Sequence, residues 1–186
     1  MKPFADKKIT VLGLGGVGGY VGALLADTYP HVTFVARGER GKSIREKGLV
    51  LHSDYRGERT VRPERVVETA ESLETQDYIF ICVKNYSLKE ACLSLAGCVS
   101  EGTVIVPVMN GADPGDRVRE YLPKGTVVDS LIYIVAFANA DFSITQQDKF
   151  ANLYVGIQDA SAPCWQKCCD VTDLLNIAGV DCTASR

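Results

Sequence analysis

Three glycines near the N-terminus have the spacing of a turn that binds phosphate groups. Gly13, Gly15 and Gly18 form the pattern G-x-G-x-x-G between an apolar run typical of a strand and a segment typical of a helix. We expect Gly13 to allow a sharp turn, Gly15 to let the backbone approach a pyrophosphate, and Gly18 to let the helix pack closely on the strand. The N–H groups of the turn and the positive end of the helix dipole would face the phosphates. The residues predicted to bind a dinucleotide are Gly13, Leu14, Gly15, Gly16, Val17 and Gly18.

An arginine, Arg37, directly follows the second predicted strand, 19 residues after Gly18. Domains that bind NAD carry an acidic residue at about this distance, where it binds the ribose 2′-hydroxyl. This strand instead ends in Ala36, Arg37 and Gly38, with Arg40 nearby. Because a guanidinium group matches the geometry of a phosphate, Arg37 favours NADP over NAD. The alternative interpretation is a surface arginine in contact with solvent only.

Two polar residues, Lys84 and Asn110, directly follow predicted strands at 78–83 and 103–108. Each residue taken alone is typical of a solvated loop. Open α/β sheets, however, bind their ligands outside the carboxyl ends of the strands. The matching placement of Lys84 and Asn110 therefore makes both of them candidates for the functional site.

These candidates depend on an alternation of strand-like and helix-like segments, which favours an α/β fold. We expect a Rossmann-like, doubly wound and mainly parallel sheet with helices on both faces. Its strands are predicted at 8–14, 31–36, 78–83 and 103–108, and its helices at 17–28, 40–47, 88–95, 114–121 and 161–178. Asp113 is the expected N-cap of the fourth helix and Gly179 the C-cap of the last. A hairpin is predicted within 49–61, and further strands at 127–137, 143–146 and 152–156, the last two antiparallel at the sheet edge.

Length and composition restrict the class of protein. The 186 residues suit one domain, and 46% hydrophobic with 23% charged residues is typical of a soluble globular protein. A net charge of −3 argues against nucleic acid as a partner. The uncharged run 9–26 also resembles a signal peptide or a membrane span. Its six glycines and the strand pattern that follows favour the turn, so we expect no membrane association.

The chain has seven cysteines, which is an odd number, and it is not small. We therefore expect no disulfide framework and expect the protein to reside in a reducing cytoplasm. Cys164, Cys168 and Cys169 lie close enough in sequence to suggest a metal site. There is no C-x-x-C pair, and the two histidines, His31 and His52, lie far away in sequence. We therefore expect thiols on a helix face and no metal.

The glycine motif, Arg37, the strand ending at Lys84, and Asn110-Gly111 together resemble the N-terminal domain of the ketopantoate reductase (2-dehydropantoate 2-reductase) family over most of residues 7–160. The separation of 26 residues between Lys84 and Asn110 also fits that family. The resemblance implies that residues 13–18 hold the pyrophosphate of NADPH and that Arg37 holds its 2′-phosphate. It places Lys84 and Asn110 beside the nicotinamide ribose and the substrate, with 134–137 also lining the cofactor.

The reaction that the resemblance implies is hydride transfer from NADPH to a 2-oxo acid. The substrate would be ketopantoate, which is reduced to pantoate in pantothenate and coenzyme A biosynthesis. Lys84 and Asn110 would assist by stabilising the alkoxide as it forms. Two alternatives stay open, namely a free-standing NADP(H)-binding module without catalysis and a reductase of a related 2-oxo acid.

The chain departs from the family pattern at its C-terminal side. The family's helical second domain, which carries the general-acid lysine and most substrate contacts, has no counterpart before Arg186. The usual Pro-Gly after the segment 127–137 is also replaced, by residues 139–142. We expect 1–180 to form the NADP-binding domain, 181–186 to begin a linker to the absent domain, and this chain alone to be inactive. Apolar surface exposed at the substrate cleft would favour a homodimer.

Overall fold

The computed structural model describes residues 2–186, and its centre is a six-stranded parallel sheet. The strands have the order β5-β2-β1-β6-β7-β8. Their bounds are β1 (Ile9–Leu12), β2 (Val32–Val35), β5 (Arg65–Val67), β6 (Tyr78–Ile81), β7 (Val104–Pro107) and β8 (Thr126–Val127). Every residue of β1, β2, β6 and β7 is buried, as expected for parallel strands that are covered on both faces.

The order of the strands creates a switch point between β1 and β6. From β1 the chain proceeds outward through β2 to β5, and it then returns to β6 and proceeds outward on the other side to β8. Loops that leave β1 and β6 at their carboxyl ends therefore diverge, which leaves space for a ligand between them. Strand β5 was not predicted, because three residues are too few to show a periodic pattern.

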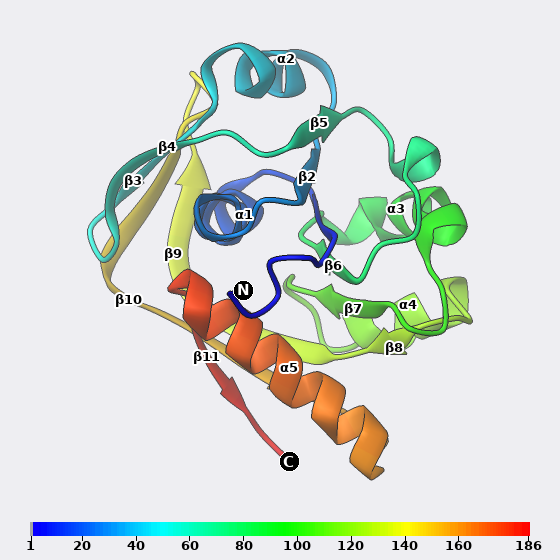
Figure 1. The fold of residues 1–186 in the computed structure, drawn as a ribbon. Coiled ribbons are helices and arrows are strands. Elements are labelled where there is room, and N and C mark those ends of the chain that lie inside the picture. The colour runs from blue at the N-terminus through cyan, green and yellow to red at the C-terminus, as the bar shows by residue number, and fades with distance from the viewer. Residues whose placement is uncertain (1) are drawn as a thin grey trace.

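Helices cover both faces of this sheet, which confirms the predicted fold class (Figure 1). Helix α1 (Gly16–Thr28) packs on one face, and α3 (Leu88–Leu95) and α4 (Pro114–Tyr121) pack on the other, while α2 (Gly38–Lys47) follows β2. Short 3-10 helices lie at η1 (Ala70–Ser72), η2 (Asn85–Ser87) and η3 (Ala96–Cys98). Asp113 occupies the N-cap position of α4 as predicted, but its side chain makes no capping hydrogen bond.

A second sheet lies beyond α1, and it was not expected. It contains β3 (Leu49–Ser53), β4 (Gly57–Val61), β10 (Ile144–Gly156) and β11 (Asp181–Ala184) in the order β11-β10-β3-β4, with β9 (Asp129–Ala138) antiparallel to β10. The hairpin prediction for 49–61 is confirmed. Residues 144–146 and 152–156 are strand and pair antiparallel with β9, as predicted, but their placement as two strands at the edge of the parallel sheet is wrong, because both belong to the single strand β10 of this second sheet.

The physical reason for the second sheet is the apolar surface of α1. Residues 18–25 of this helix are all buried, so the helix has no polar face to present to solvent. The inward side chains of β10, Ile144, Leu153 and Val155, join the same hydrophobic core as α1. Figure 1 shows α1 end-on between β9 and the parallel strands. The uncharged run that resembled a membrane span is thus divided between β1 and a helix enclosed by two sheets.

No helix among residues 2–186 is both long enough and apolar enough to cross a bilayer.

The C-terminal residues belong to the second sheet. Helix α5 (Ala162–Ala178) ends at Gly179, whose φ of 89° is the left-handed C-cap conformation that was predicted. Strand β11 then pairs in parallel with β10. The carboxylate of Asp181 accepts hydrogen bonds from Tyr55 Oη at 2.6 Å and from Arg56 Nη2 at 2.7 Å. Residues 181–184 are therefore ordered, and the linker predicted to begin at 181 stays a prediction.

One face of β9 exposes large apolar side chains. Alternate residues Leu131, Tyr133, Val135 and Phe137 are 55%, 56%, 40% and 43% exposed. The ring of Tyr133 also packs edge-on against Tyr154 of β10, with 6.2 Å between ring centroids. We call these four β9 residues the β9 apolar row. A contiguous row of this kind is typical of a surface that binds another protein surface.

Candidate dinucleotide site

The glycine turn is shaped by close contact between α1 and the carboxyl ends of β1 and β6. Gly13 has a φ of 94°, and a Cβ there would lie 2.6 Å from the carbonyl oxygen of Cys82. A Cβ at Gly18 would lie 1.8 Å from the carbonyl oxygen of Gly13. Both distances are far below van der Waals contact, so only glycine fits at either position. These are the steric roles that were expected of the sharp turn and of the close helix packing.

Gly15 differs from its neighbours because a Cβ there would have no atom within 4 Å. It is also the N-cap residue of α1, where no side chain caps the helix and no acidic residue occupies the first turn. The N–H groups at the start of this 13-residue helix therefore have no capping side chain, and the N-cap residue Gly15 borders open space. This combination suits an anionic group such as a pyrophosphate.

Strand β9 contributes to the turn in a way that the sequence did not predict. A Cβ at Gly16 would lie 2.3 Å from the carbonyl oxygen of Ala136, so the second sheet touches the glycine turn directly. Ala136 and Phe137 thus lie against the turn, but no residue of the segment 134–137 lines the adjacent cleft. The thiol of Cys82 lies beneath the turn, and its burial raises its pKa to about 12. It therefore stays neutral at physiological pH.

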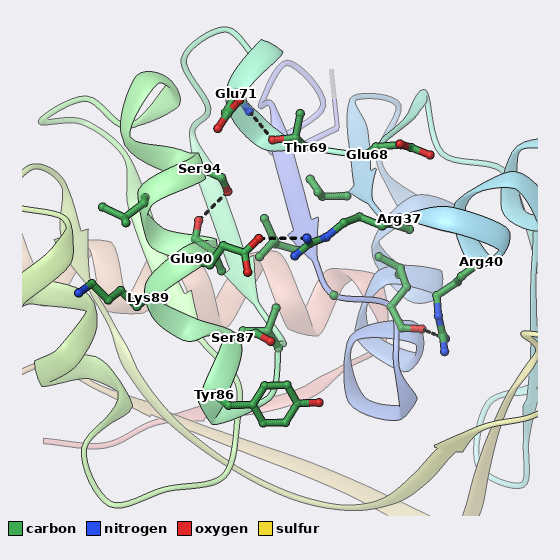
Figure 2. Close-up of a pocket in the computed structure, with 18 residues that line it drawn as sticks. Arg37, Arg40, Glu68, Thr69, Glu71, Tyr86, Ser87, Lys89, Glu90 and Ser94 are labelled. Atoms are coloured by element: carbon green, nitrogen blue, oxygen red, sulfur yellow. Dashed lines mark hydrogen bonds and ion pairs between the residues drawn. The ribbon is translucent and has the colours of Figure 1, made fainter.

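A cleft of about 730 Å³ opens beside the glycine turn (Figure 2). Its volume lies in the range of small-molecule sites. The walls come from the carboxyl ends of β1 and β2, the segment after β5, and helix α3 on the opposite side. The residues lining the cleft include Leu12, Gly13, Leu14, Val35, Ala36, Arg37, Arg40, Glu68, Thr69, Val83, Tyr86 and Glu90. It therefore occupies the switch point of the sheet, where ligands of this fold class bind.

Arg37 lies in this cleft and contacts more than solvent. It follows β2 as predicted and occupies the N-cap position of α2. Its Nη1 atom is 3.0 Å from Oε1 of Glu90, and both side chains are about two-thirds exposed, at 68% and 69%. Arg40, one turn later, donates to the carbonyl of Leu14 within the glycine turn. Figure 2 shows Arg37 and Glu90 reaching toward each other from opposite walls.

Lys84 and Asn110 lie close to each other but outside the cleft lining. Lys84 follows β6, Asn110 follows β7, and both are exposed. The side-chain amide of Asn85 donates to the carbonyl of Asn110 at 3.1 Å, which ties the two loops together. Residues on both sides of Lys84, namely Val83 and Tyr86, do line the cleft. The structure thus brings together the loops after β6 and β7 that carry the two candidates, and the loop after β6 borders the cleft.

The formal charges of the residues that line the cleft balance. They comprise three carboxylates (Glu68, Glu71 and Glu90) and three cations (Arg37, Arg40 and Lys89). The sequence did not point to the carboxylates, because they come from the segment after β5, from η1 and from α3, far along the chain from Arg37. Selection of a phosphorylated ligand here would depend on individual pairs rather than on a strongly positive surface.

The described residues show no group of three metal-ligating side chains, and Cys168 is buried on α5 while Cys164 and Cys169 are partly exposed.

The doubly wound sheet, the glycine turn and the cleft at the switch point together define an α/β dinucleotide-binding domain. Comparison with known proteins identifies the particular family. Residues 9–159 match the family described as Ketopantoate reductase PanE/ApbA, and the chain belongs to that family.

Individual relatives agree with this assignment. The chain is 32% identical over 127 residues to an uncharacterised oxidoreductase of Bacillus subtilis, and the aligned region covers 68% of this chain and 41% of that protein. It is 31% identical over 147 residues to a 2-dehydropantoate 2-reductase of Mesorhizobium japonicum, with 44% of that protein covered. The crystal structure of 2-dehydropantoate 2-reductase from Porphyromonas gingivalis superposes with a TM-score of 0.83 at 31% identity, over 96% of this chain and 64% of that one. The chain thus spans less than half the length of these two curated relatives.

Two glycine substitutions test how closely the backbone is packed at Gly18 and at Gly15. We expect Gly18→Ala to lower the free energy of unfolding by about 3 kcal/mol, because the added methyl group overlaps a backbone carbonyl that cannot move aside. Gly15→Ala should cost only about 1 kcal/mol, the preference of an N-cap position for glycine over alanine, since its methyl group enters open space. Urea unfolding followed by circular dichroism measures both values. Equal losses in the two variants would contradict the proposed difference in packing.

Proposed function

We propose that this chain is the NADP(H)-binding portion of a reductase that converts ketopantoate to pantoate in pantothenate and coenzyme A biosynthesis in the cytoplasm. The observation that carries the proposal is the glycine turn, whose Gly13 and Leu14 line a cleft that also contains Arg37. The printed names of the relatives from Mesorhizobium and Porphyromonas, both 2-dehydropantoate 2-reductases, support the choice of substrate.

The residues present fit this cofactor. The N–H groups at the start of α1 would hold the pyrophosphate, because they lack a capping side chain and the adjacent Gly15 leaves open space beside them. Arg37 would bind the 2′-phosphate through charge-assisted hydrogen bonds. The nicotinamide ring supplies the hydride when the cofactor is bound.

Lys84 and Asn110 would act on the substrate side. The Lys84 ammonium offers a positive charge, and the Asn110 amide offers an N–H donor to the oxygen that becomes an alkoxide. An amide cannot transfer a proton to that oxygen as a general acid does. We therefore propose that the proton donor is a lysine of a second domain, in the part of the curated relatives that this chain does not cover.

Two alternatives remain distinct from this proposal. The first is a module that binds NADP(H) without catalysis. The second is a reductase of a different 2-oxo acid. The fold does not choose the substrate, because it is also found in a D-mandelate dehydrogenase solved with NADH and anilino(oxo)acetate, at 18% identity and a TM-score of 0.80.

Removal of Arg37 tests the cofactor assignment. We expect Arg37→Ala to weaken NADPH binding by about 10- to 200-fold, because a hydrogen bond to a charged group contributes roughly 1.5–3 kcal/mol. NADH binding should change less than about threefold, and titration of cofactor fluorescence measures both constants. Lys42→Ala is the matched control, since it removes one exposed cation from α2 outside the cleft lining. An unchanged ratio of NADPH to NADH affinity would refute the role of Arg37.

An activity assay tests the division of labour between domains. This chain should bind NADPH but should not oxidise it when ketopantoate is added, because the proposed proton donor lies outside it. Fusion of the C-terminal domain of the Mesorhizobium relative should restore turnover, followed by the loss of NADPH absorbance. Turnover by the 186 residues alone would contradict the proposal, and binding without turnover in the fusion would favour the non-catalytic module.

We also propose that the chain forms a homodimer through the β9 apolar row. Sedimentation velocity should show a concentration-dependent shift toward a dimer, since burial of large apolar side chains drives association. Val135→Lys should return the protein to a monomer. Ile177→Lys is the control, because it places the same charge on an exposed apolar residue of α5. A monomer at all concentrations of the unmodified chain would contradict a dimer.

A further inference from the structure

The partner of Arg37 is a carboxylate on the opposite wall of the cleft. Glu90 Oε1 lies 3.0 Å from Arg37 Nη1, although the two residues are 53 positions apart in the sequence. Arg37 follows the carboxyl end of β2, whereas Glu90 lies in the first turn of α3. The pair therefore exists only because the fold places α3 across from β2.

The ion pair between Arg37 and Glu90 can be broken at little cost to the stability of the fold. Both side chains are about two-thirds exposed, and exposed ion pairs add little to folding stability.

We infer that Glu90 is a specificity-determining residue that limits the preference of this site for 2′-phosphorylated dinucleotides. The inference rests on the proposed function, in which Arg37 binds the 2′-phosphate. Glu90 and that phosphate then compete for the same guanidinium group, and the ligand must displace the carboxylate. A dinucleotide without the 2′-phosphate leaves the Arg37–Glu90 pair intact, so it does not meet this competition.

The other cleft carboxylates do not share this position. Oε1 of Glu68 lies 3.9 Å from Nη2 of Arg45, a residue of α2 that does not line the cleft. Glu71 lies on η1, and the hydrogen bond found there joins its backbone N–H to Thr69 Oγ1. Figure 2 shows Lys89 pointing away from the Arg37–Glu90 pair, so it does not neutralise Glu90. Among the charged residues that line the cleft, Glu90 is the one in contact with Arg37.

The test compares two charge-neutralising variants of equal size. Glu90→Gln should bind NADPH about 3- to 10-fold more tightly at low ionic strength, and the gain should shrink at high salt, where charge interactions are screened. Its affinity for NADH should stay within about twofold. The matched control, Glu71→Gln, removes the same charge from the same cleft and should change neither affinity by more than about twofold. The adenine-side fragments 2′,5′-ADP and 5′-AMP serve as further probes and should reproduce the same contrast.

The outcomes separate this inference from the proposed function. If the unmodified chain binds NADPH and Glu90→Gln binds it equally well, the role of Glu90 is overturned while the cofactor assignment stands. Equal tightening for NADPH and NADH also overturns it, because the effect would not depend on the 2′-phosphate. In the Arg37→Ala background the gain should be less than half as large, and an undiminished gain would overturn competition for Arg37. If no variant binds NADPH, both the proposed function and this inference fail.

Discussion

Helix α1 approaches β1 and β6 so closely that a Cβ at position 18 would lie 1.8 Å from the carbonyl oxygen of Gly13. That approach places the start of the helix at the carboxyl ends of the central strands. It also forces Gly13 into a left-handed backbone conformation and leaves the space around Gly15 open. The turn, the direction of the helix N–H groups and the adjacent cleft all follow from this one contact. A larger residue at position 18 would move the helix and change all three.

The same contact explains why the domain needs a second sheet. A helix that packs so closely through glycines and apolar side chains is buried along residues 18–25 and leaves no polar face for solvent. The second sheet buries the other side of the helix, and its strand β9 touches the glycine turn through the carbonyl of Ala136. The second sheet thus supports the position of the candidate site as well as the core.

Much of the fold could be predicted from the chain because its signals are local. Helix α3 lies at the predicted residues, α5 begins one residue later than predicted and ends where expected, and the hairpin of β3 and β4 forms as expected. Periodic apolar residues, capping residues and glycine turns predict these elements. The assignment of β10 to the sheet edge failed because alternation of apolar residues shows that a strand has a buried face and does not show which element covers it.

The same distinction between local and long-range information applies to the candidate site. The amino-acid sequence by itself determined the glycine turn, the arginine after β2, and the placement of Lys84 and Asn110 after two strands, because residue type and spacing along one strand-turn-helix unit carry that information. Only the tertiary structure decided that Glu90 faces Arg37, that β9 touches the glycine turn, and that Lys84 and Asn110 lie outside the lining of the cleft. The physical reason is that these contacts join segments tens of residues apart, and their distances depend on how the helices and the second sheet pack on the central strands.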